Sequence, residues 1–326
     1  MNFRIPPCSF SLLLMAGAGG FQPWAARGQS PASPPDFPLV TVVCGAPGDE
    51  AHHARFEQRL GALRKVLTSR YGIPADGIRI YYGPESAGYA GPATRDRVKQ
   101  ACDKARAAIQ GGRTVWFIVM GHANDAPGDV RFNLPGDDLP GKELTAWLKP
   151  DSSPAPAAAP APAGAPGSAA APGSVEASAP AVSPAAGTSV PSEGPAPGGT
   201  LNLILTTACG GRAVVHAAGP RRAVMAATDA VEGYDETVFP DALIQSLESP
   251  STDADRDGRV SLTELFQAAK GRVDAVYRER GCIQTEHAVL DGDGDGRATR
   301  RPAEKDAAAA SGPAHSLKIK PSGFSS

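Results

Sequence analysis

The stretch TVWFIVMGHA at residues 114–123 decides the fold. Val115 to Val119 form an uninterrupted run of apolar, mostly β-favouring residues between Gly112 and Gly121. Apolarity that is continuous rather than alternating predicts a strand that is covered on both faces. His122 follows at once, so this strand is expected to deliver an imidazole at its downstream end.

A second stretch, LNLILTTACGG at residues 201–211, has the same character. Its apolar run starts after Gly199 and is followed by Cys209. One imidazole and one thiol at the downstream ends of two buried strands are the components of a cysteine–histidine dyad. A buried, purely structural histidine and cysteine are the alternative.

Further strands and helices complete the pattern. Strands are predicted at Leu39–Val43, Ile78–Tyr82 and Val224–Ala227. Helical periodicity runs from Phe56 to Tyr71, and a second helix is expected after an N-cap at Thr94. This alternation predicts a three-layer α/β domain with a mainly parallel sheet. Ligands of such sheets bind beyond the carboxyl ends of the strands, where the imidazole and the thiol are expected.

The order of these features resembles the caspase-like clan of cysteine peptidases, which includes legumains, gingipains and metacaspases. The segment VVCGAPGDE at residues 42–50 is similar to the first strand and loop of legumain-like proteins, and most of all to secreted bacterial members. The resemblance covers roughly residues 39–295 with one long interruption. It implies a three-layer caspase-like fold in which Cys209 is the nucleophile and His122 the general acid and base.

The same resemblance assigns the oxyanion donors to the backbone N–H groups of Ala123 and Cys209. Relatives usually have glycine directly after the catalytic histidine, whereas this chain has Ala123 there and Gly121 before the histidine. Alanine keeps the N–H but resists positive φ. The catalytic prediction therefore depends most strongly on the geometry of the Ala123 donor.

Substrate contacts also follow from the resemblance alone. The residues that it implies are Asp49, His52, His53, Thr207 and Asp229. Acidic groups would suit a basic substrate side chain, whereas histidines would suit an acidic or amide one. Both preferences stay open, as does a role as solvated residues at the start of a helix.

A calcium-loop pattern is independent of the dyad. Residues 253–264, DADRDGRVSLTE, fit D-x-[DN]-x-[DN]-G-x5-E at every defined position. The expected Ca²⁺ ligands are the side chains of Asp253, Asp255, Asp257, Ser261 and Glu264 and the backbone carbonyl of Arg259. A helix is expected to follow the loop, whereas Pro250 interrupts the one before it.

A possible second metal site comprises Asp291, Asp293 and Asp295, which repeat the first half of this pattern. The twelfth position of this second loop is Pro302 rather than glutamate. The half-loop is therefore either completed by other oxygens or binds no metal. Pairing of the two loops favours a structural role for calcium over a sensing role.

Composition divides the chain into segments. Residues 1–28 read as a secretory signal peptide, and residues 150–200 as a disordered Ala/Pro/Gly/Ser insertion. The caspase-like domain is predicted in two parts, 36–149 and 201–249, followed by a calcium-loop region at 250–297 and a disordered tail at 298–326. The mature protein is expected to be periplasmic or extracellular, with no membrane span after signal cleavage.

The expected function is that of a secreted caspase- or legumain-like cysteine endopeptidase, stabilised by Ca²⁺, that acts on a peptide or protein. A formal net charge of −2 and a pI near 6.3 give no basic footprint for nucleic acid. Two alternatives are a non-catalytic calcium-binding scaffold that retains the peptidase fold, and an enzyme that cuts only its own linker. Cys44 and Cys102 are interpreted as structural, and no disulfide is firmly predicted.

Overall fold

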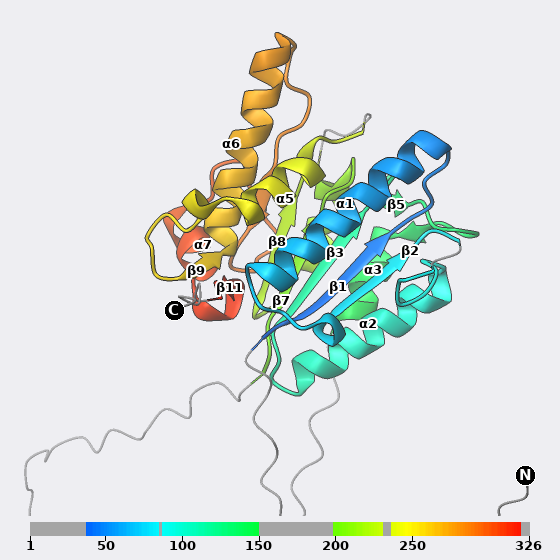
Figure 1. The fold of residues 1–326 in the computed structure, drawn as a ribbon, viewed down its shortest axis with the longest axis horizontal. Coiled ribbons are helices and arrows are strands. Elements are labelled where there is room, and N and C mark those ends of the chain that lie inside the picture. The colour runs from blue at the N-terminus through cyan, green and yellow to red at the C-terminus, as the bar shows by residue number, and fades with distance from the viewer. Residues whose placement is uncertain (1–36, 85–86, 150–197, 231–235, 321–326) are drawn as a thin grey trace, which may run out of the picture. The chain divides into compact units, whose positions relative to one another are not determined.

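Six strands form the central sheet of the protein, which a computed structural model describes over residues 37–84, 87–149, 198–230 and 236–320 (Figure 1). In spatial order they are β10 (Val289–Asp291), β8 (Arg222–Ala226), β7 (Leu201–Leu205), β3 (Val115–Met120), β1 (Leu39–Cys44) and β2 (Ile78–Tyr82). Only the β10–β8 pair is antiparallel among these. The prediction of an α/β protein with a mainly parallel sheet is confirmed.

Helices cover both faces of this sheet. Over the described residues they are α1 (Glu50–Ser69), α2 (Arg95–Gln110), α3 (Gly141–Leu148), α4 (Val214–Ala217), α5 (Phe239–Glu248), α6 (Leu262–Arg280) and α7 (Glu304–Ala309). Apolar residues of α1, α5 and α6 belong to one core and those of α2, α3 and α4 to a second. Figure 1 shows α1 and α5 side by side on one face.

The uninterrupted apolar run of β3 is explained by these two cores. Trp116 and Ile118 lie in the core under α1 and α5, and Phe117 and Val119 lie in the core under α2 and α3. Since successive side chains of a strand point to opposite faces, both faces of β3 have to be apolar. All six residues of the strand are buried.

The strand order reverses between β1 and β3. From β1 the chain crosses to β2 on one side, whereas β3, β7 and β8 follow one another on the other side. Ligands of open parallel sheets bind where the strand order reverses in this way, at the carboxyl ends of the strands. β7 lies directly beside β3, with Val119 opposite Leu205, so the two strands that carry the predicted dyad are neighbours.

Two smaller sheets flank the central one. One contains β4 (Ala123–Ala126), β5 (Asp129–Phe132) and β6 (Leu139–Pro140), and the other pairs β9 (Arg259–Ser261) with β11 (Ser316–Lys318). The first of them begins directly after His122. The chain therefore leaves the central sheet at His122.

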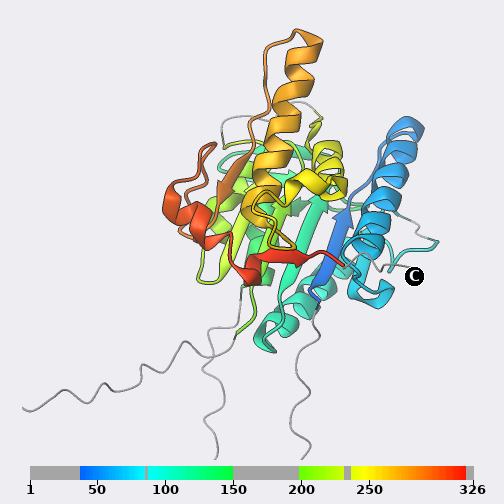
Figure 2. The same cartoon turned by 60° about the vertical axis from the view of Figure 1, so that its left-hand side comes forward.

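The predicted disordered tail at 298–326 is wrong for residues 298–320. These residues contain α7, a 3-10 turn and β11, and Figure 2 shows them in red against the rest of the described protein. Leu317 is buried and its strand pairs with β9. A six-residue helix and a three-residue strand are too short to give a clear hydrophobic period, and β11 depends on a partner strand far away in the sequence.

The predicted signal peptide at 1–28 and nearly all of the predicted insertion at 150–200 lie outside the described residues. None of the helices in the described ranges combines the length and the apolar character that crossing a membrane requires.

Candidate active site

His122 leaves the central sheet through a turn that only glycine adopts easily. Gly121, just after β3, has φ +104°, and a Cβ there would lie 3.1 Å from the backbone nitrogen of Gly45. Ala123, by contrast, starts β4 in extended conformation. The left-handed residue therefore precedes the histidine, and the alanine that follows it needs no positive φ.

The His122 ring is held on three sides. Its Nε2 lies 3.1 Å from the carbonyl oxygen of Pro47, in the loop after β1. The rings of His52 and Phe56, both from α1, lie 4.7 and 5.3 Å away between ring centres. Because a carbonyl oxygen only accepts hydrogen bonds, Nε2 carries the proton in this arrangement. The lone pair of the neutral ring then resides on Nδ1, which is the atom available to act as a base.

Cys209 follows β7 in a strained conformation. Its φ of +56° is left-handed, which costs a non-glycine residue roughly 1–2 kcal/mol. The next turn, η2 (Gly210–Ala213), packs tightly, since a Cβ on Gly211 would come within 2.4 Å of the carbonyl oxygen of Thr228. Strain of this kind persists only where the surrounding structure enforces it, and it concentrates at functional sites.

The surroundings of Cys209 disfavour its thiolate form. Burial, with only 2% of the residue exposed, raises the pKa of Cys209, and the nearby Asp125 carboxylate raises it further. Arg212 lowers that pKa but is itself paired with Asp125 at 3.0 Å. A nucleophilic role for this thiol therefore requires a base that removes its proton.

A cleft of about 300 Å³ lies where the ends of β3 and β7 meet. Its lining residues are Gly121, His122, Ala123, Asn124, Asn133, Ala208, Glu236 and Thr237. His122 and the residue just before Cys209 share this cleft, whereas Cys209 itself is not among the lining residues. The structure thus places His122 and the residue before Cys209 at one cleft, with Cys209 itself buried.

Two of the five predicted substrate contacts are bound to each other. Asp49 caps α1 by accepting the backbone N–H of His52 at 2.8 Å, and its carboxylate also lies 2.7 Å from His52 Nδ1. These bonds, together with the ionic attraction to His52, hold the pKa of Asp49 below its usual value. Because His52 also contacts the ring of His122, this pair serves to support the histidine of the cleft.

His53 points elsewhere. Its Nδ1 lies 2.6 Å from the hydroxyl of Tyr82, and the two rings are stacked 5.6 Å apart. Both residues line a second, wider cleft of about 790 Å³ beside Pro47 and Asp49. The sequence predicted His52 and His53 as one group, but neighbouring positions of a helix face different directions, and the structure separates them.

Thr207 and Asp229 do not line the cleft beside His122. Thr207 is 1% exposed, and its hydroxyl has no hydrogen-bond partner among the described residues. Asp229 forms an ion pair with Arg300 from the C-terminal region. No local sequence pattern indicates this pairing, since it depends on how residues after β10 fold back.

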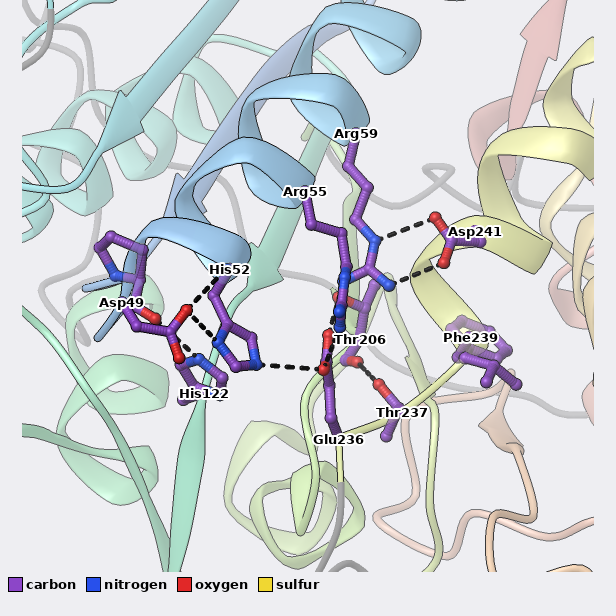
Figure 3. Close-up of polar contacts among 12 residues, drawn as sticks. Asp49, His52, Arg55, Arg59, His122, Thr206, Glu236, Thr237, Phe239 and Asp241 are labelled. Carbon is purple, nitrogen blue, oxygen red and sulfur yellow. Dashed lines mark hydrogen bonds and ion pairs between the residues drawn. The ribbon is translucent and has the colours of Figure 1, made fainter.

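A charged network that sequence reasoning missed continues from His52 (Figure 3). His52 Nε2 lies 3.4 Å from Glu236, which also accepts from Arg55 and, at 3.1 Å, from Arg59. Arg59 in turn makes two bonds of 2.9 and 2.7 Å to the carboxylate of Asp241. The only signal in the sequence was two arginines four residues apart beside the apolar stripe of α1.

The network ionises Glu236. Partial burial opposes ionisation, but the hydrogen bonds and charges of Arg55 and Arg59 hold the pKa of Glu236 below its usual value. Arg59 is only 7% exposed and touches carboxylates of both the Glu236 segment and α5. The network therefore ties α1 to the segment that closes one wall of the cleft.

The predicted calcium ligands form two clusters. Carboxylate oxygens of Asp253, Asp255 and Asp257 lie within 4.8 Å of one another, and the same holds for Asp291, Asp293 and Asp295. In the first loop, Glu264 accepts from Ala254 at 2.7 Å and closes a capping box with Ser261. Arg259 starts β9, and its backbone N–H donates to the carboxylate of Asp257 at 2.7 Å.

Comparisons with known proteins add nothing to this geometry, since no family model matches the sequence and no curated protein matches it significantly. The arrangement of side chains is therefore the basis for the functional conclusion.

Proposed function

We propose that the protein is a secreted, caspase- or legumain-like cysteine endopeptidase. The observation that carries the proposal is the convergence of His122 and the Cys209 turn at the adjacent ends of β3 and β7, beside one cleft. The orientation of His122 by the Pro47 carbonyl and the left-handed backbone of Cys209 support it. The predicted signal at residues 1–28 supports secretion.

Peptide hydrolysis would proceed through a thioester. His122 Nδ1 accepts the proton of Cys209 Sγ, and the sulfur electron pair forms a bond to the carbonyl carbon while the C=O pair moves to oxygen. As the tetrahedral intermediate collapses, His122 gives its proton to the leaving amine. A water molecule then loses a proton to His122 and attacks the thioester, which releases the acid and restores the thiol.

The Pro47 carbonyl has a defined part in these steps. When His122 becomes doubly protonated, its Nε2–H stays bonded to this oxygen, which stabilises the cation and fixes the orientation of the ring. The backbone N–H groups of Ala123 and Cys209 would stabilise the oxyanion. The extended conformation of Ala123 means that its donor does not depend on glycine-like freedom.

Calcium would act as a structural ion in the first acidic loop. The carboxylates of Asp253, Asp255 and Asp257 repel one another without a cation, and carboxylate oxygens are the ligands that Ca²⁺ prefers. Glu264 would exchange its hydrogen bond from Ala254 for the ion. The loop lies between α5 and α6, so the ion would stabilise their packing.

One observation favours the alternative of a non-catalytic scaffold. Cys209 is 2% exposed, and burial raises its pKa. If the thiol never reaches the cleft, the fold would serve binding only.

A single experiment decides between these functions. Purified protein is incubated with a peptide library and an electrophilic peptide probe in a Cys282→Ser background, which removes the exposed thiol as a source of unspecific labelling. We expect labelling at Cys209 and cleavage that falls at least about 10³-fold in Cys209→Ala and about 10²–10⁴-fold in His122→Ala. Cys102→Ala, which removes a buried thiol from α2, is the matched control and should keep full activity.

Absence of both labelling and cleavage would support the scaffold instead. Cleavage that is confined to residues 150–200 of the chain itself, followed by mass spectrometry, would identify a self-processing enzyme.

A further inference from the structure

The second acidic loop acquires a fourth carboxylate from α7. Asp306 comes four residues after Pro302, the position where a calcium loop of this type would have glutamate. The helix approaches the loop so closely that a Cβ on Gly292 would lie 2.0 Å from the backbone carbonyl oxygen of Asp306. Glycine at 292 is therefore what allows the helix to reach the loop.

The side chain of Asp306 is buried with one oxygen unused. The residue is 4% exposed, and its Oδ1 has no hydrogen-bond partner among the described residues. The carboxyl group hydrogen-bonds with the carboxyl group of Asp293, a member of the cluster, and also accepts the backbone N–H of Ala303. An unsatisfied buried carboxylate oxygen beside a second carboxylate is costly, and such a group calls for a cation or a proton.

The backbone of the second acidic loop encloses one buried carboxylate. Asp291 is fully buried, and its oxygens accept the backbone N–H groups of Gly294 at 2.9 Å and Gly296 at 2.8 Å. Carboxylate oxygens of Asp293 and Asp295 lie within 4.8 Å of those of Asp291. The loop thus places two further carboxylates beside a buried one.

One positive group already sits at the cluster. Lys305 Nζ lies 2.7 Å from Asp293 and 3.2 Å from Asp295, and its side chain is 64% exposed. The four carboxylates would carry four negative charges against this single positive one. A flexible, mostly exposed lysine is able to swing away when a stronger cation binds.

We propose that Asp291, Asp293, Asp295 and Asp306 bind one Ca²⁺ ion, with Asp306 in place of the missing carboxylate at Pro302, and that the ion displaces the Lys305 ammonium group. Four carboxylates from a loop and a helix suit a hard cation that tolerates irregular geometry, which favours Ca²⁺ over Mg²⁺. This site does not depend on peptidase activity or on the first acidic loop.

The ion would link three parts of the chain. Asp291 ends β10 at the edge of the central sheet, and Asp306 belongs to α7. The loop also touches the segment after Cys209 and α4, because the N–H of Gly219 donates to the carbonyl of Gly294 at 2.9 Å. Binding would therefore stabilise the sheet edge and the region that supports the Cys209 turn.

The test uses the full chain with Cys209→Ala, so that catalysis has no part, and with Asp253→Ala and Glu264→Gln, which disable the first loop. Isothermal titration with CaCl₂ in buffer containing 2 mM Mg²⁺ should give one site. Asp306→Asn should weaken it at least about tenfold, whereas Glu304→Gln, which removes an exposed charge from the same helix, should change it little. Thermal unfolding in EDTA checks that each variant is folded.

Lys305→Met provides a result of opposite sign. It removes the competing cation, so calcium affinity should rise several-fold at low ionic strength. The proposal is overturned if the first-loop-disabled protein binds no Ca²⁺, if Asp306→Asn binds it with unchanged affinity, or if Lys305→Met fails to raise the affinity. A proton shared by Asp293 and Asp306 would produce the first of these results. None of these measurements depends on the activity of the intact enzyme, so they test this site independently of the proposed peptidase function.

Discussion

The backbone strain at Cys209 leads to a stability prediction of unusual sign. At most positions a glycine variant is less stable than an alanine variant by about 0.5–1 kcal/mol, because glycine gives the unfolded chain more conformational freedom. At φ +56° alanine also carries the left-handed cost of roughly 1–2 kcal/mol, which glycine avoids. The difference leaves Cys209→Gly more stable than Cys209→Ala by about 0.5–1 kcal/mol.

Position 102 is the matched control for this comparison. Cys102 is a fully buried cysteine inside the regular helix α2, so Cys102→Gly should be less stable than Cys102→Ala by about 1 kcal/mol. Each pair of variants removes one thiol, and the two variants of a pair differ only in the methyl group and in backbone freedom. The sign of the glycine–alanine difference should therefore reverse between the two positions.

Urea unfolding at constant pH measures these free energies, provided that all four variants keep the same m value. In thermal unfolding, 1 kcal/mol corresponds to about 2–4 °C for a domain of this size. If Cys209→Gly is equal to or less stable than Cys209→Ala, the left-handed strain is absent, and the argument that a functional turn positions this thiol fails with it.

Three further predictions concern the surroundings of the site. Arg59→Met should destabilise the protein by about 1–3 kcal/mol in urea unfolding, because the 7%-exposed guanidinium loses its bonds to Asp241 and Glu236 while both carboxylates stay partly exposed to water. Arg55→Met, at 44% exposure, should cost about 1 kcal/mol or less, and equal effects would contradict the network. Burial lowers the pKa of His315 to about 4, so the folded protein holds this ring neutral while the unfolded chain protonates it below about pH 6.5. The free energy of unfolding should therefore fall by about 3 kcal/mol between pH 6.5 and pH 4. His315→Asn should flatten that part of the pH–stability curve. Leu317→Ala should lower the free energy of unfolding by about 2–4 kcal/mol, whereas Ile283→Ala, at an 89% exposed position, should change it very little. Equal Tm values for the two variants would mean that the C-terminal strand does not pack as described.

Much of the central sheet was predictable because its signals are local. The runs at residues 39–43, 78–82, 115–119 and 201–205 are rich in apolar, β-favouring residues, and each forms a parallel strand of that sheet. The helix stripe from Phe56 to Tyr71 gave α1 for the same reason. Such patterns reflect burial on both faces or on one, which any strand or helix of the fold must satisfy.

The cleft was only partly predictable. His122 and the Cys209 turn were located from their positions after two strands, but the burial of the thiol and its pairing with Asp125 and Arg212 were not. The network of Arg59, Glu236 and Asp241 joins residues that lie about 180 positions apart. No local period records a contact between charged groups that meet only after folding.

The sequence by itself determined the parallel strands of the central sheet, the main helices, the residue types at the strand ends and the two acidic loops, because each depends on side chains a few positions apart. Tertiary structure alone decided which charges pair, that β11 adds to β9, and that Asp306 reaches the second loop where Pro302 offers no ligand. Those outcomes depend on how distant segments approach one another. The left-handed backbone at Gly121 also depends on tertiary structure, since a Cβ there would lie only 3.1 Å from the backbone nitrogen of Gly45.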